Sequence, residues 1–423
     1  MDCFEINGGP RLRGTVNISG SKNAALPILA ATILCEGETV LHRVPDLADV
    51  RQMTHLLEKL GLSVERTGPG TLRIRVEDEM NCHAEYKEVS KMRASVCVMG
   101  PLLAKRKQAQ VAMPGGCSIG DRPVDLHIQG MTALGADFEL TNGDMLLKAK
   151  KLKGAEIFLG GAFGSTVTGT ANVMMAAVLA DGRTIIESAA CEPEIVDLSE
   201  FLNKCGANIK GYGTPRITIE GTGSLTGCEH TILPDRIEAG TFAIAAAITN
   251  GDLSLKCARL EHMLAVVDRL RKIGVIIERA EDGVAVSSAR RLEPIDITTQ
   301  PYPGFPTDLQ AQVMALLCLA DGNSVLCEKV FPDRFLHVAE LNRMGARLRK
   351  EGPTVIVQGV KRLVGAPVMA SDLRASAGLV LAGLVARGRT VVRRAYHIDR
   401  GYERIEEKLS AVGADVRRVD EEL

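Results

Sequence analysis

Residues 201–211 read FLNKCGANIKG, which predicts an amphipathic helix that ends at a glycine and is followed by a strand. Similar phrases occur five more times, as LLEKLGLSVER, MTALGADFEL, RLRKIGVIIER, ELNRMGARLRK and KLSAVGADVRR. Their glycines recur about every 70 residues, at Gly61, Gly135, Gly206, Gly274, Gly345 and Gly413. A constant period of this size indicates a repeated supersecondary unit. The sequence therefore predicts six copies of one repeat.

A second phrase lies upstream in each repeat, for example STVTGTANVMMAAVLADGRTIIES at residues 165–188. Its small apolar residues cover nearly all faces of a helix, which is typical of a helix buried on every side. A glycine follows in most repeats and is expected to cap that helix: Gly37, Gly182, Gly251, Gly322 and Gly388. Each repeat is expected to run helix, strand, helix, strand, strand.

Six such repeats predict an α/β protein of two domains, each with three repeats whose sheets surround a layer of small-residue helices. We expect one domain over residues 22–230 and a second domain from residues 1–21 together with 231–423. The strand-like segment RLRGTVNIS at residues 11–19 could close either domain. Ligands are expected in the cleft between the domains.

Composition limits the possible partners. The 51 basic and 52 acidic residues of the 423-residue chain nearly cancel, so no overall field favours nucleic acid or a membrane surface. We therefore expect small-molecule substrates, without a cofactor or a metal. The eleven cysteines are odd in number and contain no C-x-x-C pair, and no apolar segment is long enough to span a bilayer. These features predict a cytoplasmic protein.

Cations stand where three of the buried helices are expected to begin, at Lys22, Arg93 and Arg374. A cation at a helix N-terminus opposes the helix dipole. A bound anion between the cation and the free N–H groups would remove this conflict. We therefore predict anion binding there, with solvated cations on exposed helix ends as the alternative.

The stretch MPGGCSIGDRPVDLH, residues 113–127, carries a cysteine on an expected loop. Cys117 lies five residues before Arg122 and close to a helix start, surroundings that stabilise a thiolate or make a thiol a usable proton donor. We predict a functional role for Cys117 and a structural role for each of the other ten cysteines. The six repeats differ at the start of their second, amphipathic helix. The residues at this position are Asp46, Arg122, Glu192, Glu261, Arg334 and Arg400.

Two further segments allow more than one interpretation. Asp308 in YPGFPTDLQAQ is expected at a helix start, where it could cap the helix or act as a general base. GGAFGSTVTG at residues 160–169 only loosely resembles a phosphate-binding loop, and a plain turn is favoured.

Taken together, these motifs resemble the enolpyruvyl transferases over essentially the whole chain. The resemblance is carried by GSKNAALPILAA, KMRAS, PGGCSIGDRPVDLH, CEPEIVD, LPDRIEAGTF, FPTDLQAQ, ASDLRASA and HIDRGYERIEEKL. It implies a two-domain inside-out α/β barrel with three similar units per domain. It also implies transfer of the enolpyruvyl group of phosphoenolpyruvate to the 3′-hydroxyl of UDP-N-acetylglucosamine, with release of phosphate. This reaction is the first committed step of peptidoglycan synthesis, on which the cell wall, cell shape and cell division depend.

The resemblance also implies roles for individual residues. Cys117 would protonate or capture phosphoenolpyruvate and would be alkylated by fosfomycin, and Asp308 would take the hydroxyl proton. Lys22, Arg122, Arg374 and Arg400 would surround phosphoenolpyruvate, and Asn23 would lie between the two substrates. Positions that would line the nucleotide-sugar site are Arg93, Arg122, Pro123, Val124, Asp125, Leu126, Gly160, Gly161, Ala162, Phe163 and Val330.

Two alternatives stay open. The chain could act like 5-enolpyruvylshikimate-3-phosphate synthase, although PGGC and RPVDLH argue against it. It could also be an inactive sugar-nucleotide-binding paralogue.

Overall fold

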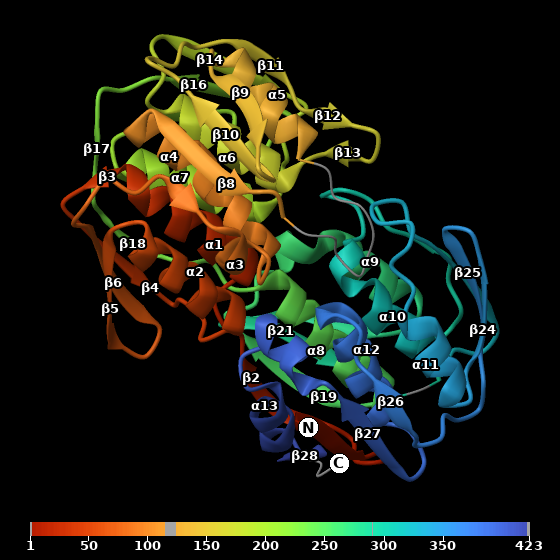
Figure 1. Cartoon of the computed structure of the whole chain (residues 1–423). Helices are drawn as coiled ribbons and strands as arrows, with labels where there is room; N and C mark the ends of the chain where they lie inside the picture. Colours follow the sequence, from red (N-terminus) through yellow and green to blue (C-terminus); the bar gives the residue numbers. More distant parts are fainter. Residues whose placement is uncertain (1, 115–123, 290, 421–423) are drawn as a thin grey trace. The chain divides into compact units, whose positions relative to one another are not determined.

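The computed structural model describes residues 2–114, 124–289 and 291–420. The chain forms two compact domains. The N-terminal domain contains the described residues between Gly20 and Leu233, and the C-terminal domain contains those up to Ser19 and from Pro234 onward. The elements are labelled in Figure 1.

The N-terminal domain contains three four-stranded sheets with one common pattern. Their strand orders are β18-β4-β6-β5, β7-β8-β10-β9 and β11-β14-β16-β15. In each sheet the first two strands are parallel and the other neighbours are antiparallel. The strands are β4 (Glu38–His42), β5 (Leu62–Gly68), β6 (Thr71–Val76), β7 (His83–Ala84), β8 (Gln108–Ala112), β9 (Asp137–Thr141), β10 (Asp144–Lys148), β11 (Glu156–Phe158), β14 (Arg183–Glu187), β15 (Asn208–Lys210), β16 (Arg216–Glu220) and β18 (Glu229–Thr231).

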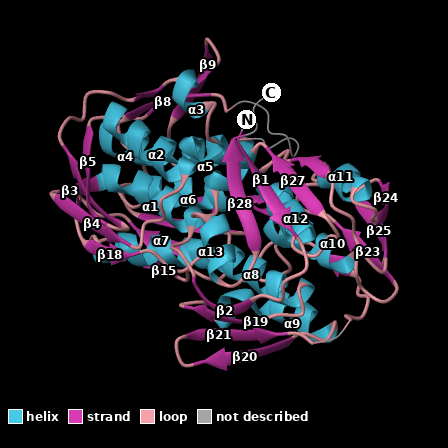
Figure 2. Ribbon diagram, turned by 90° about the horizontal axis from the view of Figure 1, so that it is seen from below, coloured by secondary structure: helices cyan, strands magenta, loops and turns pink. Residues whose placement is uncertain are grey.

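The C-terminal domain repeats this pattern in the sheets β2-β19-β21-β20, β22-β23-β25-β24 and β26-β27-β1-β28. Figure 2 shows the N-terminal strand β1 between β27 and β28. The strands are β1 (Asp2–Asn7), β2 (Arg13–Asn17), β19 (Asp252–Lys256), β20 (Ile276–Ala280), β21 (Gly283–Ser287), β22 (Ile297–Thr298), β23 (Asn323–Cys327), β24 (Arg347–Glu351), β25 (Thr354–Gln358), β26 (Pro367–Met369), β27 (Arg389–Arg393) and β28 (Asp415–Asp420). Six repeats are thus confirmed, each with a parallel strand at one edge of its sheet. Of these six strands the sequence predicts only β2, which lies within the strand-like segment at residues 11–19.

Each repeat contributes one inner helix, and these helices are buried on nearly all sides as predicted. They are α1 (Lys22–Ala31), α4 (Met99–Arg106), α6 (Val167–Ala177), α8 (Arg236–Ile248), α10 (Gln310–Leu317) and α12 (Leu373–Gly383). In the C-terminal domain α8, α10 and α12 all contact one another. A Cβ atom at Gly378 would lie 2.8 Å from the Ala311 carbonyl oxygen, so glycine is required where α12 meets α10. Small side chains therefore allow the close packing of the inner layer.

The outer helices end as the sequence predicts. They are α2 (Ala48–Lys59), α5 (Asp125–Ala133), α7 (Pro193–Lys204), α9 (Leu264–Lys272), α11 (His337–Arg343) and α13 (Ile405–Ala411). The glycine two residues after each helix has a positive φ, between 85° and 106°. In α5 the Ala136 N–H then bonds to the Met131 carbonyl, a Schellman closure.

The predicted glycine caps of the inner helices are wrong. The residues that cap α1, α6, α8, α10 and α12 are Thr32, Val178, Thr249, Cys318 and Leu384. The glycines follow two to five residues later, because the chain makes a further turn before the next strand begins.

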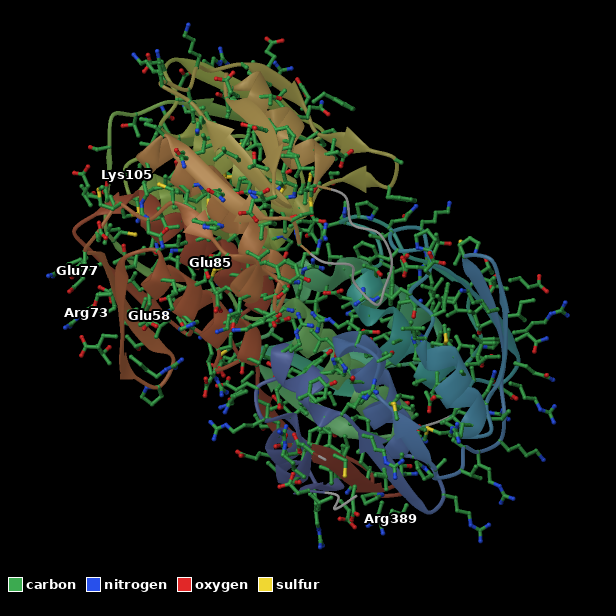
Figure 3. All side chains as sticks on the ribbon, viewed as in Figure 1. Glu58, Arg73, Glu77, Glu85, Lys105 and Arg389 are labelled. Carbon is green, nitrogen blue, oxygen red and sulfur yellow. The ribbon has the colours of Figure 1, made fainter. Side chains whose placement is uncertain are left out.

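Charged side chains such as Glu58, Arg73 and Arg389 point outward from the two domains (Figure 3).

A buried histidine ties three elements of the N-terminal domain together. The Asn172 side-chain amide donates to His127 Nδ1 at 2.9 Å and to the Val96 carbonyl at 2.9 Å, and Thr168 Oγ1 lies 3.2 Å from His127 Nε2. Burial, assisted by the nearby Arg93 charge, lowers the pKa of His127 to about 4. The ring is therefore neutral at pH 7, with Nδ1 as an acceptor.

This histidine predicts an acid-sensitive N-terminal domain. Below about pH 6.5 the unfolded chain protonates His127 and the folded chain does not, so stability falls by up to about 1.4 kcal/mol per pH unit down to pH 4. His127→Asn keeps an acceptor for Asn172 but cannot titrate. Its Tm, measured from pH 7 to 4, should fall less steeply than that of the native chain. Parallel profiles would contradict the assignment.

Candidate functional site

The C-terminal domain holds one predicted site carboxylate between two arginines. Asp308 lies in the 3₁₀ turn Thr307–Leu309, just before α10. Its Oδ1 accepts from Arg334 Nη1 and its Oδ2 from Arg374 Nη2, both at 2.9 Å. Arg334 also donates to Thr307 Oγ1 at 3.0 Å. Two guanidinium groups stabilise the charged form of the Asp308 carboxylate. No side chain caps this turn or α10, so Asp308 does not cap the helix.

Arg374 is deeply buried on α12, with 2% of the residue exposed. Its guanidinium carbon lies 5.4 Å from the centre of the Tyr402 ring. Burial alone would lower the pKa of Arg374, but Asp308 and then Tyr402 hold it above its ordinary value. The Asp372 carboxylate caps α12 by accepting from the Arg374 and Ala375 N–H groups. The negative charge of this cap stabilises the Arg374 cation, which would otherwise be opposed by the positive end of the helix dipole.

A hydrogen-bonded group extends from this ion cluster into the inner helices. Gln312 Nε2 on α10 donates to the Tyr402 hydroxyl at 3.0 Å and to the Asp308 carbonyl at 2.9 Å. Thr241 Oγ1 on α8 lies 2.9 Å from the same hydroxyl. Burial raises the pKa of Tyr402, so the phenol stays neutral. Three inner helices thus hold the residues around Asp308.

A second buried carboxylate shapes the loop beside Asp308. Glu328 has no exposed surface. Its Oε1 accepts from Thr299 Oγ1 at 2.6 Å and from the Val330 and Phe331 N–H groups at 2.8 and 3.0 Å. Its Oε2 accepts from Thr307 Oγ1 at 2.9 Å. Glu328 therefore joins the loop that carries Val330 to the turn that carries Asp308.

The last predicted site residue of this domain, Arg400, ends the 3₁₀ segment Ala395–Arg400, which contacts α12. The structure thus brings Asp308 and Arg374 into direct contact and joins Val330 to the Asp308 turn through Glu328.

In the N-terminal domain Lys22 is the first residue of α1, followed by Asn23, and Ser21 caps the helix. Lys22 Nζ lies 3.2 Å from Asp49 Oδ2 on α2. Both side chains are largely buried, so Lys22 is not a solvated cation on an exposed helix end. A partner carboxylate from the same repeat reduces the electrostatic cost of a cation at this N-terminus.

Arg93 starts a 3₁₀ segment, Arg93–Val98, and α4 begins only at Met99. The expectation that Arg93 begins the buried α-helix itself is therefore wrong. Val124 precedes α5, and Asp125 and Leu126 form its first residues. The His127 network joins α5 to the segment that Arg93 begins.

Residues 160–165 form a small hairpin in which β12 (Gly160–Gly161) pairs with β13 (Gly164–Ser165). Ala162 and Phe163 form its tip, and Phe163 is 56% exposed. A Cβ atom at Gly161 would lie 3.1 Å from Leu126 Cδ1, so the hairpin approaches α5. The structure therefore brings together Leu126 and the glycine-rich segment, two parts of the predicted nucleotide-sugar site. The predictions for Cys117, Arg122 and Pro123 lie outside the described residues.

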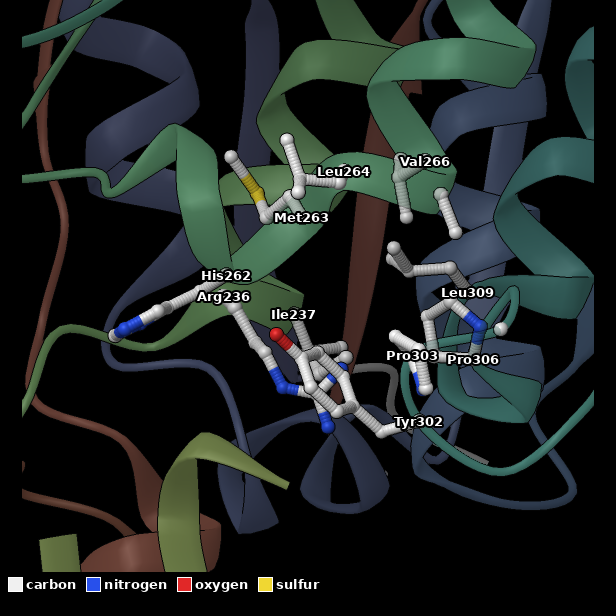
Figure 4. Close-up of a pocket in the computed structure, with 12 residues that line it drawn as sticks. Arg236, Ile237, His262, Met263, Leu264, Val266, Tyr302, Pro303, Pro306 and Leu309 are labelled. Carbon is white, nitrogen blue, oxygen red and sulfur yellow. The ribbon is translucent and has the colours of Figure 1, made fainter. Parts of the chain in front are cut away.

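A small pocket lies in the C-terminal domain beside the Asp308 turn (Figure 4). Its volume is about 30 Å³, and it is lined by Arg236, Ile237, His262, Met263, Leu264, Ala265, Val266, Tyr302, Pro303, Gly304, Pro306 and Leu309. The Arg236 guanidinium lies 5.4 Å from the centre of the Tyr302 ring. The pocket has room for only a few water molecules and is too small to hold a sugar nucleotide.

Sequence reasoning missed several residues of these clusters. Arg334 was identified at a variable repeat position but not assigned to the site, although that position was a usable signal. Asp49, Gln312, Glu328 and Tyr402 carry no local signal, because their roles depend on contacts with distant segments. Within the described residues, no three histidine, cysteine or acidic side chains lie together as a metal site. No helix in the described ranges is long and apolar enough to cross a membrane.

Comparison with known proteins identifies the family. A family model described as EPSP synthase (3-phosphoshikimate 1-carboxyvinyltransferase) matches residues 6–409. UDP-N-acetylglucosamine 1-carboxyvinyltransferase of Methylacidiphilum infernorum is 54% identical over 99% of both chains. The protein of the same name from Akkermansia muciniphila is 52% identical over 100% of both chains.

Solved structures agree on the fold. The enolpyruvyl transferase NikO from Streptomyces tendae superposes with a TM-score of 0.89, at 24% identity and 99% coverage of both chains. EPSP synthase from Acinetobacter baumannii gives a TM-score of 0.76 at 19% identity, covering 99% of this chain and 100% of its own. These matches confirm the predicted fold class. With a family match over residues 6–409 and full-length relatives that are more than half identical, the chain belongs to the enolpyruvyl (carboxyvinyl) transferase family.

Proposed function

We propose that the chain transfers the enolpyruvyl group of phosphoenolpyruvate to the 3′-hydroxyl of UDP-N-acetylglucosamine and releases phosphate. The observation that carries this proposal is the identity of 52–54% over 99–100% of relatives named UDP-N-acetylglucosamine 1-carboxyvinyltransferase. The proposal places the enzyme in the cytoplasm, at the first committed step of peptidoglycan synthesis. Cell shape and division would depend on that step.

The residues fit the proton transfers that this addition requires. A proton must reach the carbon of the enol double bond, and another must leave the attacking hydroxyl. We assign the first role to Cys117, as a proton donor or covalent nucleophile, and the second to Asp308. Because both protons belong to one addition, the two side chains must act on the same bound substrates. No metal or cofactor enters this scheme.

The ion cluster explains how Asp308 could serve as a base. With Arg334 and Arg374 both 2.9 Å away, the carboxylate is held in one orientation, but both of its oxygens are engaged in ion pairs. Phosphoenolpyruvate is an anion and would compete for the same guanidinium groups. Its binding would free Asp308 to accept a proton from the sugar hydroxyl. Lys22 and Arg400 are assigned to the same substrate, and Arg93, Leu126, Gly161 and Val330 to the sugar nucleotide.

The acceptor is tested by following phosphate release from phosphoenolpyruvate. We expect turnover with UDP-N-acetylglucosamine and none with shikimate 3-phosphate. Turnover with shikimate 3-phosphate alone would replace this proposal with the shikimate alternative. Binding of UDP-N-acetylglucosamine without turnover would indicate an inactive paralogue.

Asp308→Asn removes the proposed base while keeping the size of the side chain. We expect a folded chain that still binds UDP-N-acetylglucosamine, with kcat lowered by about 100-fold or more, which is the usual contribution of a general base. Asp333→Asn, which changes a nearby surface carboxylate, is the control and should retain activity. Normal turnover of Asp308→Asn would exclude Asp308 as the base.

Fosfomycin tests the cysteine assignment. Cys117→Ala should abolish alkylation and lower turnover, whereas Cys97→Ala should not prevent alkylation. Cys97 is buried, and this burial raises the pKa of its thiol to about 12, so it is a poor nucleophile at pH 7. Peptide mass spectrometry locates the adduct. An adduct on any cysteine other than Cys117 would contradict the assignment.

A further inference from the structure

Three thiols form a cluster in the N-terminal domain, and none of them is among the residues assigned to the reaction. Cys205 caps α7, Cys35 begins β3 (Cys35–Glu36), and Cys228 lies between β17 (Leu225–Thr226) and β18. Cys35 Sγ is 3.7 Å from Cys205 Sγ, and Cys205 Sγ is 3.3 Å from Cys228 Sγ. Cys35 and Cys205 are buried, whereas Cys228 is partly exposed.

The hydrogen bonds of this cluster centre on Cys205. Cys205 lies between the other two sulfur atoms, so its thiol can donate a hydrogen bond to Cys228. The bond from Cys205 lowers the pKa of Cys228; burial opposes this shift, and the Lys204 ammonium adds to it. The same arrangement raises the pKa of Cys205. Cys228 is therefore the member with the most thiolate character and also the one that solvent reaches, the two properties that favour oxidation.

The backbone already holds the two segments together. The Thr226 N–H bonds to the Cys205 carbonyl at 2.9 Å, and β17 pairs with β3, with Leu225 opposite Cys35. A disulfide needs sulfur atoms about 2.05 Å apart, so the 3.3 Å contact requires only a small approach of the Cys205 and Cys228 side chains.

We propose that Cys228 and Cys205 form a peroxide-responsive dithiol that closes to a disulfide. The Cys228 thiolate attacks an oxygen of hydrogen peroxide, the O–O bond breaks, and Cys228 becomes a sulfenic acid as hydroxide leaves. That hydroxide takes up the proton that the Cys228 thiol lost on ionising, which gives the first water. The Cys205 sulfur then attacks the Cys228 sulfur, the S–S bond forms, and the S–O bond breaks. The hydroxide that leaves takes the Cys205 thiol proton, so one peroxide yields two waters for each disulfide.

The site has a structural consequence that does not depend on catalysis. The disulfide would close the loop of residues 205–228, which contains β15, β16 and β17. Closing this loop restricts the unfolded chain, so oxidation should raise the Tm of the N-terminal domain.

Peptide mapping of the full chain tests this proposal. After mild hydrogen peroxide treatment and alkylation of the remaining thiols, trypsin should release peptide 205–210 linked to peptide 217–236, about 2 Da lighter than the two reduced peptides together. Dithiothreitol should reverse the link. Absence of this linked species, or a dominant link between peptides 205–210 and 23–43, would overturn the assignment of Cys228 as the oxidised thiol.

Variants separate the two roles. Cys205→Ser should leave a sulfenic acid on Cys228 that dimedone labels, and its Tm should not rise on oxidation. Cys82→Ser removes another partly exposed cysteine and should form the 205–228 link as the native chain does. If Cys205→Ser still gains Tm on oxidation, or if dimedone does not label Cys228 in it, the proposal is wrong. None of the assays in this test measures turnover. Its outcome therefore does not depend on whether the proposed function is correct.

Discussion

A carboxylate held between two guanidinium groups organises the C-terminal domain. Arg374 lies on an inner helix with 2% of the residue exposed, where an unpaired charge would cost several kcal/mol. Asp308 offsets that cost with one oxygen and binds Arg334 with the other. Tyr402, Gln312 and Thr241 then fill the space around the guanidinium and the turn. The ion cluster thus fixes the positions of α10, α12 and the Asp308 turn together.

The binding of an anionic substrate would explain why the buried cations are paired with carboxylates. An enzyme that binds a small anion needs cations that are charged in its absence and available in its presence. Internal carboxylates meet both needs, because they stabilise the buried cations and can be displaced by substrate anions. In the N-terminal domain Lys22 likewise has an internal carboxylate partner, Asp49, at 3.2 Å. Glu328 has a different task, since its four hydrogen bonds shape the loop that carries Val330.

Much of the fold could be predicted from the sequence because its signals are local and repeated. The glycines that end the outer helices need a positive φ in every repeat, and this need leaves a regular mark. The parallel strands that begin each sheet left no such mark. Most of these strands have only two or three residues, too few for an alternating pattern to be visible. The antiparallel strand β1 is hard to predict for another reason, since it joins the sixth sheet from the opposite end of the chain.

The site was predictable only in part for the same reason. Comparing equivalent repeat positions identified Lys22, Arg93 and Arg374 as unusual cations. It could not identify their partners, since Asp308 lies 66 residues before Arg374 and Asp49 lies 27 residues after Lys22. Glu328 and Tyr402 are buried polar residues without a local pattern. Their roles follow from three-dimensional contacts alone.

Hydrogen exchange of the α12 backbone amides tests the ion cluster most directly, through a double-mutant cycle of Asp308→Asn and Arg374→Met. Asp308→Asn should lower the opening free energy of α12 by about 2 kcal/mol, because it leaves the Arg374 charge buried without its carboxylate. Arg374→Met should lower it less, because Asp308 is partly exposed and keeps its ion pair with Arg334. The double variant should be more stable than the sum of these losses allows. Losses that simply add would contradict the coupling of Asp308 and Arg374 on which this description of the domain rests.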